Sequence, residues 1–357
     1  MPSNSTDNKL YVNHKILEEY AYNVFKANGL KDIDAKTAAF ALIKANLRGI
    51  DSHGIARLTM YCERLRRKVA NPNPDLTINK IANSAALIDG DNGLGLIIAP
   101  KAIDLAVKGA KEQGIYLVGV KNSGHFGMAA LYLMKAIQEN CAALIFTNSS
   151  PSMPVWGGRK PFVGTSPFGF AIPTPEGPPF ILDMAMSIAA RGKLKFAAQR
   201  GEAIPEGLAL DGEGRPTRDG KIAFEEGVML PFGGVKGACM SLMMDVLGGV
   251  FTGSRFGGET RCPFRGLDRP QGVGHVFIAF KADLFMSIES LLERMGEEVS
   301  KVKNQPPAQG FDSIMCPGEP EQKTEGIRRN SGIPLTPDII EALKTEGKVS
   351  GVEFFDC

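Results

Sequence analysis

The sequence predicts a protein of the α/β (α+β) class, in which helices from both ends of the chain flank a central sheet. Three observations favour this class. Apolar side chains recur at helical spacing through roughly the first 80 residues. Between residues 85 and 282, short apolar runs rich in strand formers alternate with helical segments. Helical spacing then returns between residues 283 and 357.

Three helices are expected in the N-terminal segment. Asn13 suits the cap of the first helix, and Gly29 suits its end. Its buried face would carry Ile16, Leu17, Tyr20, Ala21, Val24 and Phe25. The second helix is expected over residues 34–46 and the third over residues 55–68.

The central segment predicts strands and helices in alternation. Its first helix would have Pro100 at the first helical position and end near residue 113. Strands are expected over residues 115–120, 141–147, 168–172, 179–183 and 274–280. Further helices are expected over residues 128–140, 187–200 and 236–251, and then over 283–302, 319–330 and 337–346.

Composition excludes several classes of protein. The 357 residues carry 41 basic and 39 acidic side chains, without the basic excess of a nucleic-acid-binding protein. The six cysteines form no CxxC pair and the four histidines show no ligand spacing, so we expect no metal site. The N-terminus lacks the apolar stretch of a signal peptide, and no apolar run is long enough to cross a bilayer. We therefore expect a cytoplasmic protein that binds neither nucleic acid nor membrane.

The sequence contains no G-x-G-x-x-G fingerprint and no P-loop. Two glycine-rich segments could still bind an anion at the start of a helix. Residues 231–237 contain Lys236 and Gly237, and residues 124–127 contain His125. The alternative is that these glycines only allow close packing and that Lys236 is a solvated charge.

Residues 51–58 hold the strongest candidate for catalysis. His53 can donate or accept a proton near neutral pH, and Ser52 can hydrogen-bond its ring or the substrate. Arg57 lies four residues further on, about one helical turn away, and a guanidinium can bind a carboxylate through two hydrogen bonds. An acid next to a carboxylate-binding group suits a small 2-oxo acid. The alternative is a histidine at a helix start next to a surface arginine.

Several motifs resemble the malate/L-lactate dehydrogenase family, which lacks a Rossmann fold. SHGIARLTMY resembles its signature, and the other matches follow in family order from about residue 46 to 335. They are NSGHFGMAALY, VGTSPFGFAIP, ILDMAMS, ARGK, IPEGLALDGEGRPT, LPFGGVKG, PGEPEQ and GIPL. The family also includes ureidoglycolate, sulfolactate and diketogulonate oxidoreductases and cyclic imino-acid reductases.

The resemblance implies an NAD(P)-dependent 2-hydroxy acid dehydrogenase, malate- or lactate-like, with NAD slightly favoured. It implies a cofactor domain with a mixed sheet and helices over residues 85–282. A mainly helical substrate and dimerisation domain would combine residues 1–84 with 283–357. By position, His53 is the proton donor, Ser52 its relay neighbour, and Arg57 and Thr165 bind substrate. The implied cofactor-binding residues are His125, Asp183, Met184, Ala185, Lys236, Gly237, Gly318 and Glu319.

Three positions depart from the family pattern. Ser166 stands where Asn is usual, and Lys193 and Val235 stand where the imine-reducing branch has Asp and His. The last two departures favour hydroxy acid chemistry over imine reduction. A ureidoglycolate or cyclic imino-acid oxidoreductase remains the alternative, and a nucleotide-binding protein without catalysis is a more distant one. The sequence does not identify the substrate, the preferred cofactor or the physiological direction.

A homodimer is also expected. Helices at the two chain ends offer apolar side chains that one small helical layer would leave uncovered, which usually marks an interface. These residues are Tyr20, Val24, Phe25, Ile339, Ile340 and Leu343.

Overall fold

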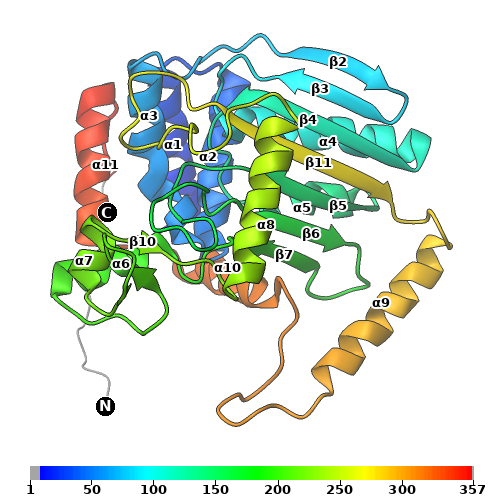
Figure 1. Ribbon diagram of the computed structural model, residues 1–357. Helices are drawn as coiled ribbons and strands as arrows, with labels where there is room; N and C mark the ends of the chain where they lie inside the picture. The colour runs from blue at the N-terminus through cyan, green and yellow to red at the C-terminus, as the bar shows by residue number, and fades with distance from the viewer. Residues whose placement is uncertain (1–8, 356–357) are drawn as a thin grey trace.

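A seven-stranded mixed sheet forms the centre of the molecule (Figure 1). The computed structural model describes residues 9–355. The strand order is β2-β3-β4-β11-β5-β6-β7, in which β3 and β4 run parallel and the other neighbouring pairs antiparallel. The strands are β2 (Thr77–Ala82), β3 (Ala85–Asp89), β4 (Ile115–Ser123), β11 (Val273–Lys281), β5 (Cys141–Thr147), β6 (Phe168–Ile172) and β7 (Phe180–Met184). The predicted fold class is confirmed.

Helices cover both faces of this sheet. Because side chains alternate along a strand, Ala143 and Ile145 of β5 join the core beneath α4 (Gly95–Gln113) and α5 (Ala130–Gln138). Leu144 and Phe146 of the same strand pack on the other face, against α8 (Val235–Asp245). A π-helical turn, Val246–Val250, continues α8. Figure 1 shows α8 in front of the sheet and α4 and α5 behind it.

The two ends of the chain fold together beside the sheet. Strand β1 (Leu10–Val12) pairs antiparallel with β12 (Ile333–Leu335). Helix α11 (Pro337–Ser350) contacts α1 (His14–Ala27) and α3 (Leu58–Arg66), and α10 (Glu319–Ser331) contacts α2 (Asp32–Leu47). The C-terminal helices therefore reach the helices that precede and follow residue 53.

The apolar surface expected to form a dimer interface is used within the subunit. Tyr20, Val24, Phe25 and Leu343 are all buried, and the Tyr20 hydroxyl donates to the Leu343 carbonyl at 2.6 Å. Ile339 and Ile340 are partly buried against the same core. The prediction that this face is uncovered is wrong, because α1 and α11 cover each other.

Several local predictions need correction. Helix α4 begins at Gly95, so Pro100 lies inside the helix rather than at its first position. The hairpin β2–β3 was not predicted. Ile16 is 42% exposed and does not belong to the buried face of α1. The third helix begins as a 3₁₀ turn, Ile55–Arg57, before α3.

The remaining elements lie at the periphery. Helices α6 (Arg191–Arg200) and α7 (Gly220–Glu225) pack with a small sheet of β8 (Ala209–Leu210), β9 (Pro216–Thr217) and β10 (Val228–Met229). Helix α9 (Ile288–Lys303) lies at the edge of the molecule (Figure 1). Within residues 9–355, no helix has the length and apolar character needed to cross a membrane.

Candidate active site

A pair of short 3₁₀ turns presents His53. The first turn is Asp51–His53 and the second is Ile55–Arg57, with Gly54 between them. A Cβ atom on Gly54 would lie 2.2 Å from Asn46 Oδ1, so only glycine lets the two segments approach this closely. The Ser52 hydroxyl and His53 Nδ1 share a hydrogen bond of 3.0 Å. The predicted hydrogen bond between the Ser52 side chain and the His53 ring is therefore present. The other ring nitrogen, His53 Nε2, has no hydrogen-bond partner among the described residues.

Arg57 lies on the same side of this turn. Its Nε donates to the Ser52 carbonyl at 2.5 Å, and its guanidinium lies 4.6 Å from the centre of the Phe264 ring. The two terminal nitrogens make no hydrogen bond to the described part of the chain. They are therefore free to bind a carboxylate while the Nε contact and the aromatic ring hold the guanidinium in place.

His125 joins the site from the end of β4. Its ring stacks on His53 at 5.3 Å between centroids and 14° between planes. Its Nδ1 shares a hydrogen bond of 2.5 Å with the Tyr61 hydroxyl, and its backbone N–H donates to Gln271 Oε1 at 3.0 Å. A residue 72 positions from His53 in the chain is thus the neighbour of the candidate proton donor.

The environment keeps both stacked rings neutral. Burial lowers the pKa of His53 to about 4, and the nearby Arg57 charge lowers it further. Burial, followed by the charges of His53 and Arg57, lowers the pKa of His125 well below its usual range. Burial also raises the pKa of Tyr61, so its phenol stays protonated at neutral pH.

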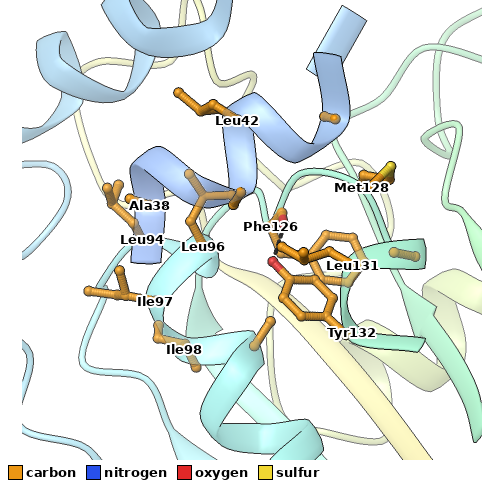
Figure 2. Close-up of a cluster of buried hydrophobic side chains, with 14 of the residues drawn as sticks. Ala38, Leu42, Leu94, Leu96, Ile97, Ile98, Phe126, Met128, Leu131 and Tyr132 are labelled. Carbon is orange, nitrogen blue, oxygen red and sulfur yellow. Dashed lines mark hydrogen bonds between the residues drawn. The ribbon is translucent and has the colours of Figure 1, made fainter. Parts of the chain in front are cut away.

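The segment that follows His125 is anchored in the main core. Figure 2 shows Phe126, Leu131 and Tyr132 close together in the core cluster that also contains Leu42 of α2, with the Tyr132 hydroxyl donating to the Phe126 carbonyl. The same segment reaches Asp183 at the end of β7, because the Ala130 N–H donates to Asp183 Oδ2 at 2.8 Å. One rigid segment therefore connects the His53 region to the predicted cofactor region. Although the Asp183 carboxylate is accessible, the surrounding protein desolvates it enough to raise its pKa to about 6.

Backbone contacts bring the other predicted cofactor residues near β7. The Met186 N–H donates to the Thr165 carbonyl at 2.7 Å, and the Phe232 N–H donates to the Met186 carbonyl at 3.0 Å. Met184 and Ala185 lie between Asp183 and this junction. Gly237 is buried, and a Cβ atom there would lie 2.0 Å from the Phe232 carbonyl oxygen.

Lys236 and Glu319 differ in whether their charged groups are free to bind a ligand. Lys236 is exposed in the first turn of α8 and forms no ion pair with any described residue. Glu319 is buried, and its carboxylate pairs with Lys303 at 2.9 Å and Lys323 at 3.2 Å. This carboxylate is therefore not free to bind a ligand. Gly318 adopts φ +91° at the start of α10, where a Cβ atom would lie 2.7 Å from the Pro179 carbonyl oxygen beside β7.

One groove of the molecule lies away from the predicted site. A groove of about 990 Å³ between α1, α2, α4 and α5 contains none of the predicted site residues. Sequence reasoning missed Tyr61, although its position four residues after Arg57 places it on the same helical side. It also missed Asn46 and Arg328, which both contact Asp51 in the His53 turn. Within residues 9–355, no three His, Cys, Asp or Glu side chains gather as metal ligands.

The fold is a mixed sheet covered by helices, and the candidate site joins a histidine pair to an arginine whose terminal nitrogens are unpaired among the described residues. Residues 12–344 match the malate/L-lactate dehydrogenase family, and the chain belongs to that family. It is an oxidoreductase that acts on small 2-hydroxy acids and uses a nicotinamide cofactor.

Individual relatives agree with this assignment over nearly the whole chain. L-sulfolactate dehydrogenase of Methanocaldococcus jannaschii is 36% identical over 90% of this chain and 92% of its own length. Its solved structure superposes with a TM-score of 0.90 over 96% of this chain and 98% of that one, at 33% identity. Malate dehydrogenase of Pyrococcus horikoshii gives a TM-score of 0.91 at 30% identity, over 99% of both chains. The (2R)-3-sulfolactate dehydrogenase (NADP(+)) of Chromohalobacter salexigens is 35% identical over 79% of this chain and 85% of its own length.

Proposed function

We propose that the enzyme interconverts a malate- or sulfolactate-like 2-hydroxy acid and its 2-oxo acid, with His53 transferring the proton. The observation that carries this proposal is the turn that joins Ser52, His53 and Arg57. It places an imidazole nitrogen and two terminal guanidinium nitrogens, unpaired among the described residues, within one short segment. The names of the relatives support substrates that carry a second acidic group beside the 2-hydroxy acid.

The depressed pKa of His53 suits this role. In the free enzyme its neutral ring can accept the proton of a substrate hydroxyl during oxidation. In the reverse direction, negative charge that develops on the oxo oxygen favours the protonated ring, which then donates its proton. Ser52 holds Nδ1 and thereby orients Nε2 toward the substrate. Arg57 holds the carboxylate at a fixed distance from that nitrogen.

The residues near β7 and α8 suit the nicotinamide cofactor that the family uses. When bound, the cofactor supplies or accepts the hydride. Lys236 and the free N–H groups at the start of α8 would hold its phosphate groups. Ser166 supports a ligand beside Thr165, because its buried hydroxyl has no hydrogen-bond partner among the described residues. We infer NAD or NADP, with NAD favoured.

The finer assignments belong to the same proposal. We assign residues 85–282 to cofactor binding, and residues 1–84 with 283–357 to substrate binding and dimerisation. A homodimer is supported by exposed apolar side chains along α8 and the π-helical turn, which are Val235, Leu242, Met243, Val246, Val250 and Phe251. A cytoplasmic location is supported by the five described cysteines, which are all free thiols.

The test combines a substrate panel with one variant. Purified enzyme is assayed with NADH and with NADPH against oxaloacetate, sulfopyruvate, pyruvate, the oxo acid of ureidoglycolate and a cyclic imine. We expect the two acids with a second anionic group to give the highest kcat/KM. His53→Ala should lower kcat about 10²- to 10⁴-fold with unchanged cofactor affinity. His14→Ala, which removes a histidine from α1, should leave turnover unchanged. A His53→Ala enzyme with normal turnover would exclude His53 as the acid.

A further inference from the structure

The turn that carries His53 is held from outside by a residue of the C-terminal helix α10. Arg328 forms a two-pronged ion pair with Asp51, with Nη1–Oδ1 at 2.6 Å and Nη2–Oδ2 at 2.9 Å. Its Nη1 also donates to the Asn46 carbonyl at 2.5 Å. Only 15% of the Arg328 side chain is exposed. This guanidinium therefore binds both the last turn of α2 and the first residue of the His53 turn.

Asn46 extends this grip to the other side of His53. Its side-chain nitrogen donates to Asp51 Oδ1 at 2.6 Å, and its Oδ1 accepts from the Ile55 N–H at 2.6 Å. The side chain is buried and packs directly on Gly54. Asp51 and Ile55 flank the segment that contains Ser52 and His53, so both ends of that segment are fixed by one connected network.

We propose that Arg328 is a positioning residue that sets the orientation of Ser52 and His53 through Asp51 and Asn46. The inference rests on the proposed role of His53. A planar guanidinium that makes three hydrogen bonds from its two terminal nitrogens fixes direction as well as distance, which a flexible ammonium does not. Loss of the grip would leave the imidazole in place on average but free to tilt away from its productive angle.

The neighbouring Arg329 supplies a matched control. It belongs to the same helix, and its guanidinium bonds Glu325 on α10 itself, at 2.6 Å and 3.0 Å. No hydrogen bond or ion pair connects it to the described residues of the His53 turn. Replacing Arg328 and Arg329 by lysine thus changes the same chemistry on the same helix, and only the first change touches the turn.

The experiment compares Arg328→Lys with Arg329→Lys in the full chain. We expect Arg328→Lys to lower kcat with the best oxo acid about 10- to 100-fold. Cofactor affinity, measured by NADH fluorescence, should stay within about twofold. Because Arg328→Lys loses hydrogen bonds of a largely buried ion pair, its melting temperature should fall below that of Arg329→Lys, and kcat is therefore compared at a temperature where both variants are fully folded. Arg329→Lys should leave kcat unchanged. Equal kcat in the two variants would overturn the proposal.

A double-mutant cycle separates positioning from general destabilisation and does not depend on one variant. Asp51→Asn keeps the shape of the side chain and weakens the ion pair. If the two residues act as one unit, combining Asp51→Asn with Arg328→Lys should lower kcat little more than the worse single change. Combined with Arg329→Lys, the effects should simply multiply. Multiplying effects in both pairs would reject the proposal. Normal turnover in His53→Ala would instead reject the proposed function, so the two failures are distinguishable.

Discussion

The close packing of Gly54 on Asn46 makes a quantitative prediction. Gly54 has φ −87° and ψ −153°, which other residues adopt without strain, so the effect of Gly54→Ala is steric. The new methyl group would lie 2.2–2.5 Å from the side-chain atoms of Asn46. Asn46 is buried and must move, which breaks its bonds to Asp51 and Ile55.

The magnitude follows from two contributions. Each lost hydrogen bond costs about 0.5–1.5 kcal/mol, and overpacking a dense site costs about 1–3 kcal/mol. Gly54→Ala should therefore lower the free energy of unfolding by about 2–6 kcal/mol. Because His53 is adjacent, kcat should fall about 100-fold even at temperatures where the variant is fully folded.

Urea unfolding and steady-state kinetics measure the two effects. Gly326→Ala is the control, because a Cβ atom at this position of α10 meets no atom within 4 Å. There, alanine should raise the free energy of unfolding by about 0.4–1 kcal/mol without changing turnover. A Gly54→Ala enzyme with unchanged stability and turnover would refute the steric reasoning.

Three further predictions concern other parts of the molecule. Lys236→Ala should raise the dissociation constant for reduced cofactor, and added salt should shrink the difference from wild type; equal binding at low salt would move the phosphate site elsewhere. Burial lowers the pKa of His275 to about 3, and its usual value is about 6.5, so the unfolded chain binds the proton first as pH falls. The free energy of unfolding should therefore decline as the pH falls from about 6.5 to about 3, and His275 should contribute up to about 1.4 kcal/mol per pH unit to this decline. Urea titrations of His275→Gln should show a shallower decline over the same pH range. Light scattering should give twice 38.3 kDa at micromolar concentration; a monomer mass that persists as concentration rises would contradict the homodimer.

Local sequence predicted most strands of the central sheet, but it did not predict β3, which carries the buried residues Ala86 and Ile88. The expected strands at 141–147 and 168–172 coincide with β5 and β6, because apolar runs between turn residues define a central strand. Strand β2 gave no such signal, since every one of its six residues is exposed. Helix α4 starts five residues before Pro100 because its first turns are buried under the core, which outweighs the one hydrogen bond that proline removes.

In the candidate site, too, contacts between residues close in sequence could be predicted, whereas contacts between distant residues could not. Ser52, His53 and Arg57 are close in sequence, so their proximity in the fold could be predicted. The stacking of His125 on His53 depends on how β4 enters the core, which no local pattern encodes. The contact from Arg328 spans 277 residues and depends on the packing of α10 on α2. The residues that surround Arg328 in the sequence have the pattern of an ordinary exposed helix.

The stacked pair of histidines determines under which conditions His53 can bind a proton. Ser52 and Tyr61 each engage one Nδ1, and the two rings lie parallel at 5.3 Å with Arg57 nearby. A proton on either ring would face the desolvation of the site and the charge of Arg57, which is why the pKa values of both rings are lowered. An anionic substrate bound to Arg57 neutralises that charge and so raises the proton affinity of His53. On the proposed assignment, the same carboxylate that identifies the substrate also equips His53 to receive the proton, and a neutral substrate analogue would lose both effects at once.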